Sequence, residues 1–269
     1  METIHIFDEF PYESSQEQIH AKRTLLEPLV FDILKRKYFR FLEEFWQKNS
    51  VEINSNKSII IIERRIHENL AFLLRNMFYF APGWNITLIC SDVNYKYLET
   101  ICTNNKNNVC LLPLFNGSPN REAARNEYNT LLKSVEFYES LPFDHLFIVQ
   151  TDSYLRKHID ETMLDYDYVA APFIWDNSSA GGGMSYRNKS AMIDICKNYK
   201  GDEEGEDCFI NAGIKSRGYT MPEFMKGIEY VAESCFFVDP MGVHQWWTYF
   251  TTSFEHKDLI FHKYLELKV

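Results

Sequence analysis

The chain has 269 residues, of which 45% are hydrophobic and 16% aromatic, so it can bury a substantial core and is not a disordered protein. Its formal net charge of −10 argues against a nucleic-acid partner, because binding phosphates along a strand requires a basic surface. A length of this order is typical of one large domain, with or without an extension.

The first segment, residues 1–57, differs in pattern from the rest of the chain. Apolar residues recur at helical spacing over residues 28–48, with lysine and arginine between them, which predicts an amphipathic helix. We expect this helix to pack on the main domain or on another subunit, where it would form a homodimer. The polar stretch at 50–58 reads as a linker.

From residue 58 onward, strand and helix patterns alternate. Predicted strands lie at 58–63, 85–90, 109–112, 145–149 and 168–171, and predicted helices at 66–79, 122–139 and 189–199. This order predicts an α/β fold with a mainly parallel, twisted, Rossmann-like sheet covered by helices on both faces. We expect the domain to span residues 58–250, followed by a tail at 251–269 packed on it.

A carboxylate stands where ligands bind in such a sheet, beyond the carboxyl end of a strand. The predicted strand 145–149 runs into Gln150, Thr151 and Asp152, and Asp152 could hold a hard divalent cation that bridges phosphate oxygens. Capping of the next turn is the alternative. A literal D-x-D at residues 165–167 precedes a strand, so we expect it at the wrong edge of the sheet.

Three glycines follow in the segment A-G-G-G-M-S. Gly181, Gly182 and Gly183 would let the backbone approach a ligand closely and leave amide groups free to donate. A tight turn before the helix at 189–199 is the ordinary alternative. The segment lacks the lysine of a phosphate-binding P-loop.

Two later stretches carry further polar candidates. The acidic turn E-E-G-E-D leads into a helix, and its Glu206 and Asp207 are either capping residues or a general base for an acceptor hydroxyl. His244 lies between glycine and two tryptophans, as a buried structural residue or as a metal ligand beside aromatic faces that bind sugar rings, among them Trp246.

Over residues 58–250 the chain resembles the DUF5672 group of GT-A-like glycosyltransferases. The segments that carry the resemblance are, in order, SIIIIERR, HENLAFLLRNMFYFAPGW, QTDS, DYDYVAAP, AGGGMSYRNKSAM, GEDCFI and GVHQWW. The resemblance implies a GT-A-type fold and the transfer of a sugar from a nucleotide-sugar donor, such as a UDP- or GDP-sugar, to a glycan hydroxyl. Similar proteins occur in large DNA viruses, and the asparagine- and lysine-rich loops would suit such an origin.

The resemblance also implies roles for single residues. Asp152 stands at the metal-binding position of D-x-D, with Gln150 in place of the first aspartate, and His244 would complete a site for Mn²⁺ or Mg²⁺. Asp207, with Glu206 before it, would be the base of an inverting enzyme. Residues 181–183 would adjoin the donor sugar and the acceptor, and Glu63, Arg64 and Arg65 would hold the nucleotide base and ribose.

Two rival functions remain open from the sequence. A metal-dependent sugar-nucleotide hydrolase or phosphodiesterase would need more histidine and aspartate ligands, and a catalytically silent sugar- or nucleotide-binding module is favoured by the missing first aspartate. The amino terminus lacks the pattern of a signal peptide, no apolar stretch reaches the length of a membrane span, and the cysteines read as reduced thiols. We therefore expect a cytoplasmic protein without a transmembrane segment, in the host cytoplasm if it is viral.

Overall fold

The computed structural model describes residues 16–50, 56–105, 108–117, 120–176, 180–250 and 257–269, so most of the predicted linker lies outside the described residues. The strands are β1 (Lys57–Ile62), β2 (Asn85–Ser91), β3 (Val109–Phe115), β4 (His145–Val149), β5 (Ser153–Leu155), β6 (Tyr168–Pro172), β7 (Ala180–Asn188), β8 (Val231–Ala232) and β9 (Gly242–His244). The α-helices are α1 (Gln16–Lys48), α2 (Leu70–Phe80), α3 (Asp92–Ile101), α4 (Arg121–Leu132), α5 (Val135–Ser140), α6 (Lys189–Asn198), α7 (Glu206–Arg217), α8 (Phe224–Tyr230) and α9 (Lys257–Tyr264).

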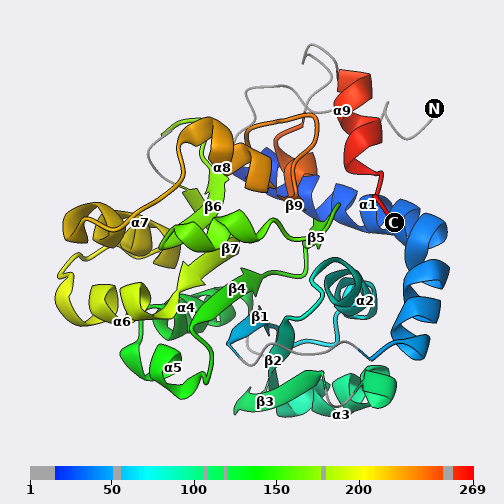
Figure 1. Ribbon diagram of the computed structural model, residues 1–269, viewed down its shortest axis with the longest axis horizontal. Coiled ribbons are helices and arrows are strands. Elements are labelled where there is room, and N and C mark those ends of the chain that lie inside the picture. The colour runs from blue at the N-terminus through cyan, green and yellow to red at the C-terminus, as the bar shows by residue number, and fades with distance from the viewer. Residues whose placement is uncertain (1–15, 51–55, 106–107, 118–119, 177–179, 251–256) are drawn as a thin grey trace.

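The central sheet has six strands in the order β3-β2-β1-β4-β7-β6. The pairs β1–β2, β1–β4 and β2–β3 are parallel, whereas β7 runs antiparallel to both β4 and β6. A second sheet of three short strands has the order β5-β9-β8 and stands beside the carboxyl end of β4 (Figure 1). The predicted mainly parallel α/β sheet is confirmed.

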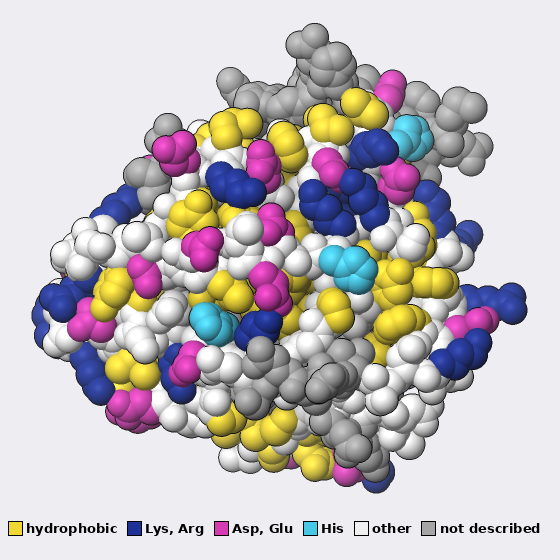
Figure 2. Space-filling model, in the orientation of Figure 1, with side chains coloured by type: hydrophobic (Ala, Val, Ile, Leu, Met, Phe, Trp, Pro, Cys, Tyr) yellow, Lys and Arg dark blue, Asp and Glu magenta, His cyan; other side chains and the backbone are white. Residues whose placement is uncertain are grey.

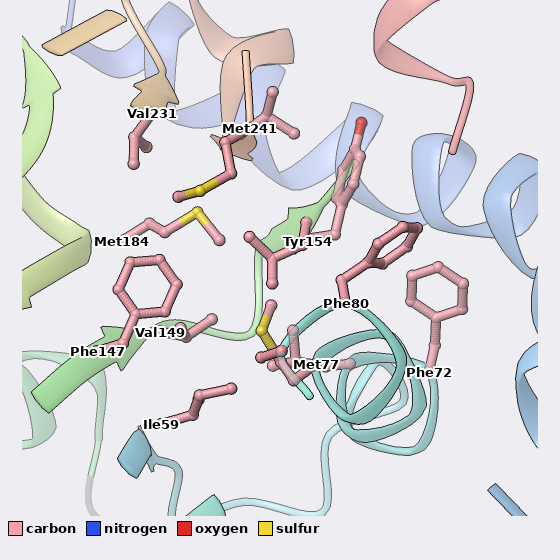
Figure 3. Close-up of a cluster of buried hydrophobic side chains, with 14 of the residues drawn as sticks. Ile59, Phe72, Met77, Phe80, Phe147, Val149, Tyr154, Met184, Val231 and Met241 are labelled. Atoms are coloured by element: carbon pink, nitrogen blue, oxygen red, sulfur yellow. The ribbon is translucent and has the colours of Figure 1, made fainter. Parts of the chain in front are cut away.

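Helices cover both faces of the central sheet, as predicted (Figure 1). Alternate residues of β1 and β4 separate two cores, because successive side chains of a strand point to opposite faces. Ile59 and Phe147 face a core formed with α1, α2 and the small sheet, whereas Ile60 and Leu146 face a core formed with α5, α6 and α7. Figure 3 shows part of the first core, in which Ile59 of β1 and Phe147 of β4 lie opposite Met77 of α2.

The amino-terminal helix is longer than predicted. Helix α1 begins at Gln16 and carries Pro28 inside it, whereas the prediction begins the helix at that proline. Proline lacks an N–H group and is tolerated best in a first helical turn, so it reads from sequence as a start. Leu26, Phe31 and Trp46 of α1 are buried in the first core, so this helix packs on the main domain.

The helix predicted at 122–139 is wrong in one respect, because it is two helices. Helix α4 ends at Leu132, and the Ser134 side chain accepts a hydrogen bond from the backbone N–H of Phe137 and so caps α5. Serine competes for backbone groups in this way at helix starts. Within the part of the chain that the structure covers, no helix combines the length and hydropathy needed to cross a membrane.

Candidate active site

Asp152 lies in the turn between β4 and β5, beyond the carboxyl end of a central parallel strand. The backbone N–H of Gln150 donates to the carbonyl of Gly183 on β7 at 2.8 Å, which fixes the start of this turn. Asp152 is almost fully buried, so its carboxylate requires charged or hydrogen-bonding partners.

His244 meets Asp152 through the small sheet. Strand β9 pairs with β5 so that His244 stands opposite Ser153, and the backbone N–H of Gln245 donates to the carbonyl of Asp152 at 3.0 Å. The His244 Nε2 atom lies 3.2 Å from Oδ1 of Asp152. These two residues, far apart in sequence, therefore share one buried site.

Glu233 holds the other side of the histidine ring. Its Oε2 lies 3.1 Å from Nδ1 of His244, and its Oε1 accepts a hydrogen bond of 2.8 Å from the Gln245 side chain. Among the described residues, Gln245 alone combines a side chain with a positive φ, 31°. Backbone of this kind persists where the surroundings enforce it, and here it aligns Gln245 with the backbone carbonyl of Asp152 and the carboxylate of Glu233.

Arg23 of α1 supplies the second cation of the site. Its guanidinium forms an ion pair with Oδ2 of Asp152. The neighbouring Glu27 accepts a hydrogen bond of 2.9 Å from Asn69, whose side chain also donates to the carbonyl of Thr151. Helix α1 is thus attached to the end of β4 by charged and polar contacts as well as by its apolar face.

The charges of the site are strongly coupled. Burial by itself would raise the pKa of Asp152, but the positive charges of Arg23 and His244 hold that pKa well below its usual value. Burial would lower the pKa of His244, but the carboxylates of Glu233 and Asp152 raise it to about 10. Without another cation present, His244 is therefore an imidazolium between two carboxylates.

The glycine segment lies in strand β7 and does not form the tight turn that the sequence offers as the ordinary alternative. Its glycines leave room for charged side chains. A Cβ on Gly181 would lie 2.8 Å from Oε2 of Glu233, one on Gly182 would lie 2.0 Å from Oε1 of Glu206, and one on Gly183 would lie 2.1 Å from Cε1 of His244. Glycine-rich sequence reads as a loop because glycine weakens strands, whereas here close approach requires it.

We expect the substitution Gly183→Ala to displace the His244 ring and to lower the free energy of unfolding by about 1–3 kcal/mol, because the added methyl group has no space. Denaturant unfolding together with NMR of the histidine ring protons measures both effects. The control is Gly117→Ala, where a Cβ meets no atom within 4 Å and only the positive φ of 70° is unfavourable. Unchanged His244 resonances in Gly183→Ala would contradict the close packing.

The two acidic candidates of the predicted turn have different surroundings. Glu206 is buried and pairs with Nη2 of Arg187 at 2.8 Å. Asp207, in the first turn of α7, is only partly buried, and its Oδ1 accepts a hydrogen bond from the N–H of Cys208. Asp207 is the carboxylate of this pair that a substrate could reach.

The predicted sugar contact of Trp246 is wrong. Its side chain is fully buried, packs against Trp247 and Phe250, and donates from Nε1 to the Tyr154 hydroxyl at 2.8 Å. A tryptophan next to a candidate histidine looks like a binding residue in sequence, but the short turn after β9 directs it into the core. Its N–H finds the partner that a buried indole needs.

The D-x-D at residues 165–167 lies where the sequence predicts, before β6. Tyr168 pairs with Arg187 and His145 with Asn188, so this end of the sheet is the one at which β4 begins, opposite Asp152. Asp167 accepts hydrogen bonds from the backbone and side chain of Thr220 and so anchors a turn.

The residues predicted to hold the nucleotide end of the donor lie after β1. Glu63 is buried and accepts hydrogen bonds from the Arg65 side chain at 2.9 and 2.7 Å, while Arg65 remains exposed. Arg64 turns toward β3, where it lies over the Phe115 ring and donates to the carbonyl of Asn116 at 2.9 Å. Arg64 therefore stabilises the loop after β3, whereas part of the Arg65 guanidinium is exposed to solvent.

The donor atoms at Asp152 and His244 fit a divalent cation. Two ligands about 2.1 Å from a shared ion stand about 3.0–3.4 Å apart, and Oδ1 and Nε2 are 3.2 Å apart. Neither atom has a hydrogen-bond partner of acceptable geometry. No group of three His, Cys, Asp or Glu side chains among the described residues could hold a metal ion, so the remaining ligands would be phosphate oxygens and water.

Sequence reasoning assigns no role to Arg23 or Glu233. Arg23 lies outside the recognised motifs, and nothing in its local pattern distinguishes it from the other basic residues of α1. Glu233 does carry a signal, because it follows the buried strand β8 much as Asp152 follows β4. A two-residue strand is too short for its sequence to reveal it.

Part of the chain is similar to a known protein family. Residues 118–244 match the family model described as "Protein of unknown function (DUF5672)". No curated protein matches the chain.

Solved structures that resemble the chain include the apo form of the glycosyltransferase GlyE from Streptococcus pneumoniae TIGR4, with 13% identity over 78% of this chain and 60% of that chain and a TM-score of 0.47. A second GlyE structure from the same organism gives 12% identity, 80% and 65% coverage and a TM-score of 0.47. A cytidylyltransferase from Leptospira borgpetersenii serovar Hardjo-bovis (strain JB197) is 14% identical, with 62% of this chain and 75% of that chain covered and a TM-score of 0.40. The chain thus spans less than two thirds of the length of the GlyE chains. Over residues 118–244 the chain is therefore similar to the DUF5672 family.

Proposed function

We propose that this protein is a glycosyltransferase that moves a sugar from a nucleotide-diphosphate-sugar donor to a hydroxyl group of a glycan acceptor. The observation that carries the proposal is the contact between Asp152 and His244 beyond the carboxyl end of β4. This is the place where α/β sheets bind their ligands, and both residues stand at positions that the family resemblance assigns to the donor diphosphate.

Asp152 and His244 would hold Mn²⁺ or Mg²⁺ together with the diphosphate. When bound, such a cation neutralises the negative charge that develops on the leaving diphosphate. Glu233 would keep the histidine ring oriented through Nδ1, as carboxylates behind metal-binding histidines do. Arg65, held by Glu63 with part of its guanidinium exposed, is suited to the ribose or base side of the donor.

Asp207 would act as the general base of an inverting reaction. The acceptor oxygen forms a bond to the anomeric carbon, the bond from that carbon to the diphosphate oxygen breaks with its electron pair leaving on the diphosphate, and the hydroxyl proton passes to the Asp207 carboxylate. The partial exposure of Asp207 supports this role, since the base must reach a bound acceptor.

Calorimetry with UDP and GDP, each with and without Mn²⁺, tests the donor site. We expect binding that strengthens with the metal, and we expect Asp152→Asn to remove the metal-dependent part, because the amide is a weaker ligand without charge. The matched control is Asp165→Asn, which changes an exposed aspartate of the literal D-x-D. Asp152→Asn with unchanged metal dependence would refute the assignment.

The same titrations, repeated with UDP- and GDP-sugars, separate the rival functions. Turnover of the donor without any acceptor would favour a sugar-nucleotide hydrolase, and metal-independent nucleotide binding without turnover would favour a silent binding module. The ion pair of Arg23 with Asp152 gives the second rival a concrete form, because a guanidinium can neutralise a diphosphate by itself. In that case Arg23→Ala would remove nucleotide binding in the absence of metal.

A further inference from the structure

Three aromatic side chains form a surface on the segments that follow β6 and β9. Phe173 and Trp175 stack with ring centroids 4.7 Å apart and an interplanar angle of 16°, and Tyr249 lies 5.9 Å from Trp175. Trp175 is 61% exposed and the adjoining Ile174 is 51% exposed. We call Phe173, Trp175 and Tyr249 the aromatic surface.

An exposed tryptophan is exceptional in this chain. The five tryptophans of the sequence all lie among the described residues, and the other four are no more than 3% exposed. A single exposed apolar residue needs no explanation, but a stacked pair of rings that leaves most of an indole in water does. Acidic, basic and hydrophobic side chains are interspersed over the face of the molecule seen in Figure 2.

The aromatic surface adjoins the candidate active site. The Phe173 ring lies 3.2 Å from the position that a Cβ of Gly181 would take, and the Glu233 carboxylate approaches the same position to 2.8 Å. Glu233 in turn pairs with His244. The surface is therefore two contacts away from the histidine of the site.

The aromatic surface lies close to the start of α7, which carries the proposed base. The Asn211 side chain donates to the carbonyls of Ala180 on β7 and Asp207 on α7 at 2.6 and 2.7 Å. Phe173 lies against Gly181, the residue that follows Ala180. Burial is the largest cause that raises the pKa of Tyr249; the negative charges of Glu233 and Asp207 raise it further, and the positive charge of Arg23 opposes them.

We propose that the sugar ring of the acceptor binds on the aromatic surface, with one face on Trp175. This inference rests on the proposed glycosyltransferase function and names where its acceptor binds. A sugar ring has a face of C–H bonds, which suits the negative face of an aromatic ring, and an edge of hydroxyl groups, which suits carboxylates. The aromatic surface and Asp207 offer these two chemistries side by side, a role that the sequence assigns to Trp246.

Collisional quenching of tryptophan fluorescence tests the proposal without knowledge of the natural acceptor. Because Trp175 is the exposed tryptophan, acrylamide quenching of the full chain reports mainly on it. We expect methyl glycosides of common hexoses, or short N-acetylglucosamine oligosaccharides, to protect Trp175 from quenching in a saturable way. Trp175→Ala should weaken binding of the same sugar, followed by saturation-transfer NMR, about tenfold or more.

Two further variants make the measurement specific. Trp175→Phe keeps an aromatic face and should restore much of the binding, whereas Phe41→Ala, which removes a 44% exposed ring from α1, should leave it unchanged. Nucleotide binding by calorimetry should be the same in the wild type and in Trp175→Ala.

The outcomes separate this proposal from the proposed function. If no sugar in the panel protects Trp175 while nucleotide binding is intact, the acceptor assignment is overturned and the donor site stands. If sugars protect Trp175 but no nucleotide binds, the sugar site stands and the transferase proposal fails. Protection that depends on protein concentration and not on sugar would assign the aromatic surface to a second copy of the chain and would overturn the proposal.

Discussion

Replacing Arg187 with methionine is expected to lower the free energy of unfolding by about 3–5 kcal/mol, because it leaves the Glu206 carboxylate buried without a counter-charge. Arg187 is fully buried on β7, where Nη2 pairs with Glu206 and Nη1 donates to the Tyr138 hydroxyl at 3.1 Å. The pair joins the central sheet to the start of α7, so its loss should also disturb the segment that carries Asp207. Denaturant unfolding measures the change.

The control for this prediction is Arg217→Met on the surface of α7. Arg217 pairs with Asp194 at 2.8 Å, the same distance as in the buried pair, but its side chain is 40% exposed. Solvent screening reduces such a pair to about 0–1 kcal/mol. Equal losses in the two variants would mean that burial of Arg187 does not determine the effect.

The double variant Arg187→Met, Glu206→Gln and the pH dependence identify the cause. The double variant should recover part of the stability, because no charge then remains buried alone. Burial already raises the pKa of Glu206, and loss of Arg187 removes the main charge that opposes this. A carboxyl with a raised pKa stabilises the folded state in acid and loses that contribution as pH rises, so the deficit of Arg187→Met should shrink toward acid pH and grow toward neutral pH.

Replacing Asp207 with asparagine is expected to slow sugar transfer by about 10²–10⁴-fold while nucleotide binding stays unchanged, because the amide cannot accept the acceptor proton. Its carboxylate lies in the first turn of α7 and accepts a hydrogen bond from the N–H of Cys208, which asparagine can also accept. Fold and position should therefore be retained. Single-turnover assays of nucleotide diphosphate release, with an acceptor that supports turnover, measure the rate.

The control is Glu204→Gln, which removes an exposed carboxylate from the same acidic turn. We expect normal turnover from this variant. Near-normal turnover in Asp207→Asn would show that another group takes the proton and would contradict the assignment of Asp207 as the base. An equal loss of nucleotide binding would indicate that Asp207 supports the donor site and not the base step.

The sequence pattern was sufficient to predict the strands and the faces on which their side chains lie. The strand His145–Val149 occurs where its apolar, β-branched run predicts it, and the alternating faces of β1 and β4 follow from burial on both sides of a parallel sheet. The position of Asp152 follows from the same logic, since whatever succeeds such a strand lies at its carboxyl end. The sequence also assigned the D-x-D at 165–167 to the opposite end.

The tertiary structure decided the features that depend on contacts between distant segments. A run of glycines is typical of a loop, yet residues 181–183 lie in strand β7. Their missing side chains leave room for Glu233, Glu206 and His244, which pack against the strand. Trp246 reads as a sugar contact, yet the turn after β9 directs it into the core. Arg23 enters the site from a helix whose sequence shows only an apolar face.

The physical reason is the range over which the stabilising interactions act. Hydrophobic periodicity and chain direction, both readable along the sequence, determined the α/β sheet and placed one carboxylate at a strand end. The partners of that carboxylate, Arg23 and His244, are brought to it by packing of α1 and pairing of β9, and no neighbouring residue in the chain specifies either contact. Only the folded structure decides which charges share a buried site.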